Sequence, residues 1–195
     1  STIQGWLMEG ARDLTLALGE VQRTAGVAPG PILEIGVWKA RYLCLLSFVP
    51  AEPTPVIGVD PIVGMPDRAA HLRSLNDIIG RYCRRPDLFQ LVERRSETLS
   101  ADELIALGGG RFQCVSIDGS HLREPVLNDI RLAEAALADG GIVAMDDISN
   151  PTMPGVWEAF IDYGLDGTGQ LEAILNCGNK LFLTQRHHAP RYREA

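Results

Sequence analysis

The sequence lacks the features of several specialised protein classes. Its apolar runs are far shorter than the roughly 18 residues that a membrane span needs, and no signal-peptide pattern opens the chain. Its four cysteines stand far apart, without the CxxC or Cys/His spacing of a zinc site or the density of a disulfide framework. We therefore expect reduced cysteines that pack as small hydrophobes, no membrane partner and a cytoplasmic location.

Basic residues are fewer than acidic residues in this chain. Lysine and arginine total 18 against 25 acidic residues, and the formal net charge of −7 argues against a nucleic-acid backbone as the partner. With 195 residues and 46% hydrophobic residues, the chain suits a single globular domain. Within that domain we expect an N-terminal helical cover over residues 1–29, a core over residues 30–185 and a loose polar tail over residues 186–195. The paired histidines of the tail, His187 and His188, are expected to be solvated and not to bind a metal.

Helical and strand-like segments alternate along the chain. Apolar residues recur at helical spacing from Gly5 to about Thr24, and Ser100 and Glu103 have the spacing of a capping box. The Gly178-Asn179 turn joins the last two strands into a hairpin. The expected strands cover residues 32–37, 55–60, 88–93, 112–118, 141–147, 171–177 and 179–185, and the later helices cover residues 38–48, 67–83, 100–107, 123–141 and 156–164. This alternation predicts an α/β fold with a mostly parallel sheet, in which ligands bind beyond the carboxyl ends of the strands.

The first strand-to-helix turn has one glycine where a dinucleotide-binding fold needs G-x-G-x-x-G. Gly36 permits close approach of a ligand to the backbone, but it offers no cradle for a pyrophosphate. A carboxylate at Glu34 would repel phosphate and suit an ammonium or sulfonium group. Asp60, at the end of the second strand, is placed to accept hydrogen bonds from ribose hydroxyls. A phosphate-free, positively charged nucleoside matches S-adenosylmethionine; the alternative is a tight turn and an exposed aspartate.

Three carboxylates, Asp118, Asp146 and Asp147, follow the fourth and fifth expected strands. Neighbouring strands lie about 4.8 Å apart, so these side chains would converge at the carboxyl edge if the two strands are neighbours. A divalent cation would remove their mutual repulsion, and oxygen ligands suit Mg²⁺, with Mn²⁺ or Ca²⁺ as alternatives. Aspartates also form turns and helix caps, but that explanation does not require two consecutive aspartates.

His121 lies three residues after Asp118 and is the candidate catalytic base. A neutral imidazole can accept a hydroxyl proton near pH 7. Two alternatives remain open: His121 could hydrogen-bond a substrate oxygen or a metal-bound water, or it could cap the helix that follows.

The segments "ILEIGVWKARYL", "VIGVDP", "VSIDGSH" and "GGIVAMDD" resemble successive motifs of class I S-adenosylmethionine-dependent methyltransferases, and in particular the metal-dependent macrocin-type sugar O-methyltransferases. The resemblance to catechol O-methyltransferase is more distant. The resemblance covers roughly residues 30 to 185. It implies a Rossmann-like, seven-stranded, mostly parallel sheet with an antiparallel last strand and helices on both faces. Ala40 departs from the family pattern, which often has glycine there.

By position, the resemblance implies roles for individual residues. Glu34 and Gly36 would face the methionine part of the cofactor, Asp60 the ribose, and Ser96 the adenine. Asp118 would contribute to the cofactor site and, with Asp146 and Asp147, to the metal site.

The expected activity is therefore methyl transfer from S-adenosylmethionine, assisted by a divalent metal, to a hydroxyl of a small diol-type acceptor. A sugar, a natural-product glycoside and a catechol all fit. A non-catalytic cofactor-binding member of this fold is an alternative that the intact carboxylate set disfavours. The lone Gly36 and the carboxylate of Glu34 count against a nicotinamide-dependent oxidoreductase. The oligomeric state is left open, with a homo-oligomer among the options.

Overall fold

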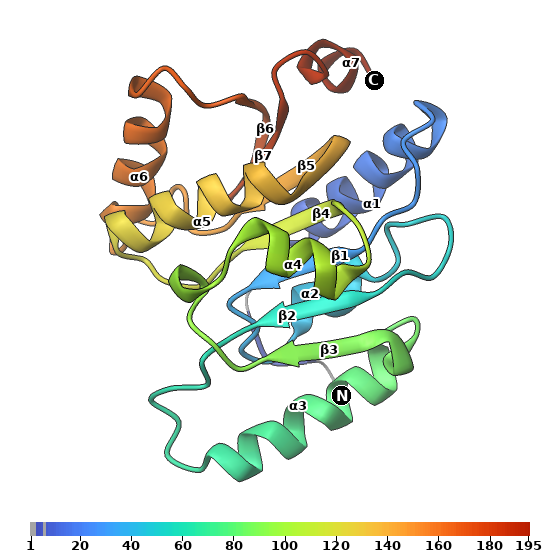
Figure 1. Cartoon of the computed structure of the whole chain (residues 1–195), viewed down its shortest axis with the longest axis vertical. Coiled ribbons are helices and arrows are strands. Elements are labelled where there is room, and N and C mark those ends of the chain that lie inside the picture. The colour runs from blue at the N-terminus through green and yellow to red at the C-terminus, as the bar shows by residue number, and fades with distance from the viewer. Residues whose placement is uncertain (1–2, 6) are drawn as a thin grey trace.

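A seven-stranded sheet forms the centre of the computed structural model, which describes residues 3–5 and 7–195 (Figure 1). The strand order is β3-β2-β1-β4-β5-β7-β6, and β7 runs antiparallel to both of its neighbours while the other pairs are parallel. The strands are β1 (Ile32–Ile35), β2 (Val56–Val59), β3 (Phe89–Val92), β4 (Phe112–Ile117), β5 (Leu137–Met145), β6 (Leu171–Cys177) and β7 (Lys180–Gln185). The expected Rossmann-like sheet with an antiparallel last strand is confirmed.

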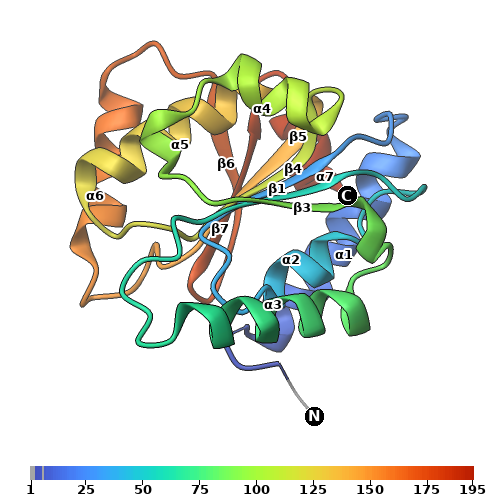
Figure 2. The same ribbon diagram turned by 60° about the horizontal axis from the view of Figure 1, so that its bottom comes forward.

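Helices cover both faces of this sheet, as the view in Figure 2 shows. One face carries α1 (Glu9–Thr24), α2 (Arg41–Leu46) and α3 (Arg68–Tyr82). The other face carries α4 (Ala101–Gly108), α5 (Arg123–Ala136) and α6 (Pro154–Leu165). Two short 3-10 turns, η1 (Pro86–Leu88) and η2 (Ser96–Thr98), flank β3, and a last helix, α7 (Ala189–Glu194), follows β7.

The central strands are buried on both faces because their side chains are almost continuously apolar. Every residue of β1, β2 and β4 is buried. Leu104 and Phe112 belong to the core beneath α4, α5 and α6, whereas Leu43 and Phe182 belong to the core beneath α1, α2 and α3. Full burial of one such side chain contributes roughly 1.5–3 kcal/mol, so the two cores together hold the strand ends in fixed positions.

Local sequence rules account for one helix start and for the hairpin. The Ser100 hydroxyl accepts the N–H of Glu103, and the Glu103 carboxylate accepts the N–H of Ser100, so the expected capping box of α4 is confirmed. Gly178 has φ +64° in the turn between β6 and β7, a conformation that glycine adopts without steric cost.

Three helix boundaries differ from the expectations by three residues or more. Helix α1 begins at Glu9 and not at Gly5, and positions 1, 2 and 6 of the expected cover lie outside the described residues. Helix α2 begins at Arg41 because Trp38 and Ala40 have φ of +39° and +53°, which are incompatible with a right-handed helix. Helix α5 ends at Ala136 because the next residue already pairs with β4, so residues 137–141 belong to β5.

The expectation of a loose C-terminal tail is wrong for residues 189–194. These residues form α7, in which Ala189 and Tyr192 are buried, and the Tyr192 hydroxyl donates a hydrogen bond to the carbonyl of Gly140. The small side chain of Ala189 and the ring of Tyr192 fix the helix on the sheet although its sequence is mostly polar.

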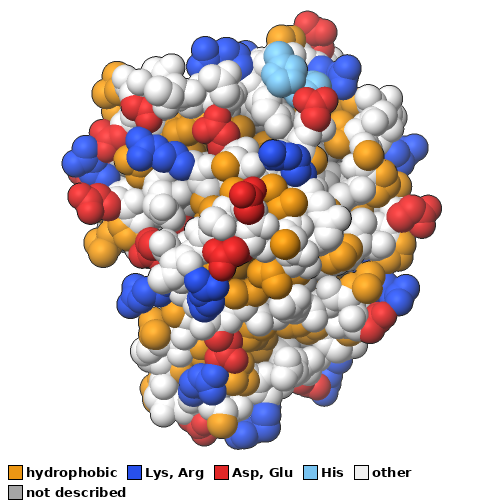
Figure 3. Space-filling view, in the orientation of Figure 1, with side chains coloured by type: hydrophobic (Ala, Val, Ile, Leu, Met, Phe, Trp, Pro, Cys, Tyr) orange, Lys and Arg blue, Asp and Glu red, His pale blue; other side chains and the backbone are white. Residues whose placement is uncertain are grey.

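The surface is mixed in character. Acidic and basic side chains interleave on the face drawn in Figure 3, with apolar patches between them. None of the helices in the described part of the chain combines the length and the apolar character that crossing a bilayer requires.

Candidate active site

A cavity of about 350 Å³ lies at the carboxyl ends of β1, β4 and β5. The start of β7, the segment before α1 and the start of α2, with Arg41 and Tyr42, contribute to its walls. Six of the eight residues that the sequence assigned to a site line this cavity: Glu34, Gly36, Asp118, His121, Asp146 and Asp147. Asp60 and Ser96 are not among the lining residues.

Glycine is required at Gly36 by the packing of the two strand ends. Gly36 has φ +87°, and a Cβ atom there would lie 2.0 Å from the carbonyl oxygen of Asp118. Contact at that distance is forbidden, so the turn after β1 and the turn after β4 approach each other as only glycine allows. From the sequence, close approach of a ligand was the expected reason for a glycine at position 36. In the structure, the close approach of the Asp118 backbone is a second reason.

Asp60 holds the turn after β1 in place. Its Oδ2 accepts the N–H groups of Val37 at 3.0 Å and Trp38 at 3.1 Å, and its Oδ1 accepts the N–H of Ile62 at 2.8 Å. These bonds stabilise a stretch that includes the left-handed backbone of Trp38 and Ala40. Asp60 therefore supports the wall of the cavity without lining it.

Ser96 lies away from the cavity. It is buried in η2, and its hydroxyl lies near Asp129 of α5, where it lowers the pKa of that carboxyl. Burial nevertheless raises the pKa of Asp129 to about 6. The structure thus shows Ser96 in contact with α5 and does not bring it to the other site residues.

The three carboxylates after β4 and β5 lie at the same end of the sheet and line the same cavity. Ile117 pairs with Met145, so Asp118 and Asp146 are adjacent at the ends of two neighbouring parallel strands. Burial, helped by the negative charges of Asp146 and Asp147 and opposed by Lys180, raises the pKa of Asp118 to about 7. The repulsion that the sequence predicts at this edge is therefore present.

Lys180 is the residue at this site that the sequence analysis missed. Its ammonium group is almost fully buried, lies 2.9 Å from an oxygen of Asp146 and sits 4.0 Å from the centre of the Tyr42 ring. Burial and the charge of Asp118 raise the pKa of Glu34 well above its usual value, and the nearby Lys180 and Ser116 act in the opposite direction. The ammonium group of Lys180 thus acts on the buried Glu34 and on the half-buried Asp118 and Asp146.

A signal for Lys180 was present in the sequence. It opens the strand after the hairpin turn, and the first residue of a strand antiparallel to β5 lies at the carboxyl edge of β5. Finding it required the knowledge that β7 and not β6 is the neighbour of β5.

Asp147 and His121 form a second polar pair. The His121 Nε2 lies 3.0 Å from Oδ2 of Asp147, while Oδ1 of Asp147 accepts amide N–H groups from Asn150 and Asn179. Asp147 has φ +59°, so its position is strained and its side chain is fixed by three partners. Because the His121 ring faces Asp147 and makes no cap bond to α5, helix capping does not explain it.

The donor set is suitable for a divalent cation. Asp118, His121 and Asp147 each offer one ligand atom, and these three atoms lie within 4.8 Å of one another. Asp146 is turned away from this group, with Oδ2 on Lys180 and Oδ1 on the N–H of Asp147 at 3.0 Å. A set of two carboxylates and one imidazole is compatible with Mn²⁺ or Mg²⁺.

Comparison with known families assigns the chain to a class. The profile described as "Methyltransferase domain" matches residues 33–148, which is more than half of the chain and extends from β1 to just beyond β5. The chain belongs to this methyltransferase domain family.

Solved structures support the same fold. CalS11, described as a TDP-rhamnose 3'-O-methyltransferase of calicheamicin biosynthesis, is 24% identical with a TM-score of 0.62, and the alignment covers 91% of this chain and 81% of that one. The O-methyltransferase NovP is 16% identical with a TM-score of 0.69 and coverages of 89% and 78%. TomG from Streptomyces achromogenes, an O-methyltransferase solved with S-adenosylmethionine, is 16% identical with a TM-score of 0.61 and coverages of 88% and 78%. A search of curated proteins gave no significant match.

Proposed function

We propose that the chain is an S-adenosylmethionine-dependent O-methyltransferase that acts on one hydroxyl of a small diol-type acceptor, such as a sugar, a natural-product glycoside or a catechol. The observation that carries the proposal is the convergence of the Gly36 turn with Asp118, His121 and Asp147 in one cavity. Membership of the methyltransferase family supports the reaction class. The descriptions of CalS11 and TomG support a sugar or natural-product acceptor and the sulfonium cofactor.

The cofactor would lie over the turn after β1. Its methionine part would meet Glu34 and Gly36, and its ribose would meet Asp60. A carboxylate has about four acceptor positions, and the three backbone N–H groups on Asp60 leave room for a ribose hydroxyl. Ser96, which is buried beside Asp129, is the weakest of the assigned cofactor residues.

A divalent cation would be held by Asp118 and Asp147, with Asp146, which is paired with Lys180 in this structure, as the third carboxylate that the sequence assigns to the metal. When bound, the ion would orient two adjacent oxygens of a diol and lower the pKa of the hydroxyl that is methylated. We assign His121, which also belongs to this group of potential ligands, to the acceptor and not to the ion.

The chain's own residues then carry the proton transfer. Asp147 orients the His121 ring, and His121 accepts the hydroxyl proton as the oxygen attacks the methyl carbon. The new C–O bond forms while the C–S bond breaks, and its electron pair stays on sulfur, so that the sulfonium becomes the neutral thioether of S-adenosylhomocysteine. Fixing both reactants in line provides much of the acceleration.

A metal-controlled turnover assay tests the proposal. The protein is incubated with S-adenosylmethionine and a panel of diols in EDTA, and then with Mg²⁺ or Mn²⁺ restored, while S-adenosylhomocysteine release is measured. Turnover that depends on the metal and is lost in Asp118→Asn supports it. Full turnover in EDTA would remove the metal from the proposal.

Binding assays distinguish the alternatives. Calorimetry should show heat with S-adenosylmethionine and S-adenosylhomocysteine and none with NAD. Binding of the sulfur ligands without turnover on any diol would favour a non-catalytic member of the fold. Binding of NAD alone would refute the cofactor assignment.

A further inference from the structure

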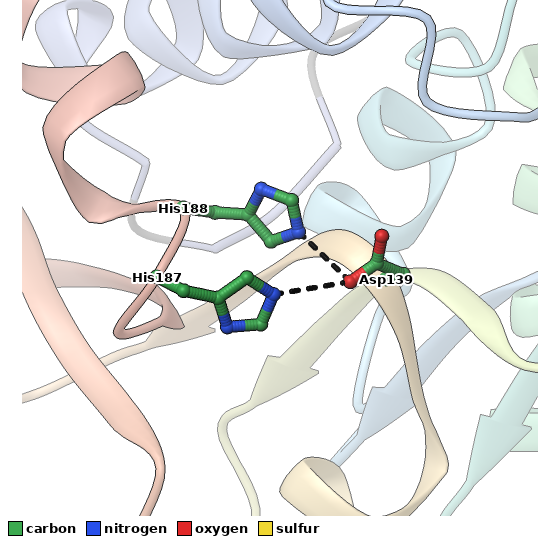
Figure 4. Close-up of side chains that lie close together, drawn as sticks. All are labelled: Asp139, His187 and His188. Atoms are coloured by element: carbon green, nitrogen blue, oxygen red, sulfur yellow. Dashed lines mark hydrogen bonds and ion pairs between the residues drawn. The ribbon is translucent and has the colours of Figure 1, made fainter.

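Three potential metal ligands meet at the ends of β5 and β7 that lie away from the cavity. Asp139 lies near the start of β5, and His187 and His188 follow the end of β7; the antiparallel pairing of these strands brings them together (Figure 4). Since β5 reaches the cavity only at its other end, the two sites are separated by roughly 20 Å of strand.

The two imidazoles converge on a single carboxylate oxygen. Nε2 of His188 lies 2.8 Å and Nε2 of His187 lies 3.3 Å from Oδ1 of Asp139, and the rings are 4.1 Å apart between centres. All three ligand atoms lie within 4.8 Å of one another. Asp139 and His187 are exposed, so an ion can reach the group from solvent.

The backbone around these residues is held in place. The Gln185 side chain bonds to the backbone on both sides of Asp139: it donates to the carbonyl of Ala138 at 2.8 Å and accepts the N–H of Gly140 at 3.1 Å. The N–H of His188 donates to the carbonyl of Gln185 at 2.8 Å. The ligands therefore project from supported backbone on both strands, which limits the entropy lost when an ion binds.

The geometry points to a transition-metal site formed by Asp139, His187 and His188, with Zn²⁺ as the preferred ion and Ni²⁺ or Cu²⁺ as alternatives. An ion about 2.1 Å from each ligand atom keeps neighbouring ligands roughly 3.0 Å apart at right angles and roughly 3.4 Å apart in a tetrahedron. The two distances to Asp139 fall close to this range. Two imidazoles select borderline transition metals over Mg²⁺, which prefers oxygen ligands, so water completes the coordination and Mg²⁺ does not compete.

Zinc titration of the full chain tests this assignment. Calorimetry with ZnCl₂ in excess Mg²⁺ should detect one ion whose affinity falls by about tenfold or more in Asp139→Asn and in His187→Ala/His188→Ala. The matched controls are Asp102→Asn, which removes an exposed carboxylate on α4, and His121→Ala, which removes the imidazole of the cavity. Both controls should retain this ion, and zinc should raise the melting temperature of both.

Copper spectroscopy on the unmodified protein gives a second measurement that does not depend on the folding of variants. Electron paramagnetic resonance of one bound Cu²⁺ should show two imidazole nitrogens, whereas the Asp118, His121 and Asp147 group offers one. Unchanged zinc affinity in the double histidine variant, loss of zinc in His121→Ala alone, or a single coordinated nitrogen would overturn the assignment. So would the absence of zinc binding to the wild type.

Discussion

Replacing Lys180 with methionine removes a buried positive charge while keeping most of the side-chain volume. Lys180 is 3% exposed, and its ammonium is 2.9 Å from Asp146, whose side chain is 17% exposed. Without it, Asp146 loses its counter-ion next to Asp118 and Glu34, two carboxyls whose pKa values are already raised by burial. Breaking one side of a buried ion pair costs about 3–5 kcal/mol, and the partial exposure of Asp146 places this case near 3 kcal/mol.

Thermal and urea unfolding measure the loss. For a domain of this size each kcal/mol lowers the melting temperature by about 2–4 °C, so Lys180→Met should melt about 6–12 °C below the wild type. The double variant Lys180→Met/Asp146→Asn leaves no unpaired charge and should recover about 1–3 kcal/mol through the coupling between the two sites. Mg²⁺ should stabilise Lys180→Met more than the wild type, because the ion supplies the missing positive charge.

Two results would contradict this reasoning. If the effects of Lys180→Met and Asp146→Asn simply add, the two groups are not partners in an energetic sense. If Lys180→Met has the same melting temperature and urea midpoint as the wild type in the presence of EDTA, the carboxyl groups of the cavity do not need a resident cation.

Three further perturbations test other parts of the molecule. Gly36→Ala should unfold several degrees lower than the wild type and lose affinity for S-adenosylmethionine, because the new Cβ collides with the Asp118 carbonyl. The control is Gly80→Ala on α3, where the added Cβ meets open space, and it should be about 0.5–1 kcal/mol more stable than the wild type. Equal melting temperatures of the two variants would refute the argument. Asp129→Asn should remove a pH dependence of stability. Burial raises the pKa of Asp129 to about 6, so the stabilising contribution of its carboxyl group is present below about pH 4 and lost as the pH rises through 6. In urea unfolding, the free energy of unfolding of the variant relative to that of the wild type should therefore rise by up to about 3 kcal/mol between pH 3.5 and pH 8. His121→Ala should lower kcat/KM by about 10²–10⁴-fold without weakening cofactor binding, and a rate close to that of the wild type would reduce the imidazole to a positioning role.

Much of the fold follows from local sequence patterns. The continuous apolar character of β1, β2 and β4 predicts strands buried on both faces, and the parallel direction of β4 and β5 predicts that Asp118 and Asp146 meet. Ser100 and Glu103 determine the start of α4 through four residues alone. These features depend on short-range chemistry, which is why they can be recognised without the tertiary structure.

What could not be predicted depends on contacts between distant segments. The left-handed backbone of Trp38 and Ala40 shortens α2, and the turn that contains it is held by hydrogen bonds from the N–H groups of Val37 and Trp38 to Asp60, which follows a different strand. The partnership of Lys180 with Asp146 depends on β7 lying between β5 and β6. Single-sequence periodicity contains no information about either arrangement.

The position of β7 has a consequence for biosynthesis. Chain elongation delivers Asp118, Asp146 and Asp147 well before Asn179 and Lys180, the residues that bind or neutralise them. A nascent chain that has emerged only as far as β5 therefore holds mutually repelling carboxyl groups at an unfinished sheet edge, and β6 cannot dock until β7 has been made and inserted beside β5. Closure of the cavity therefore has to wait for β7, which follows every other strand of this sheet along the chain.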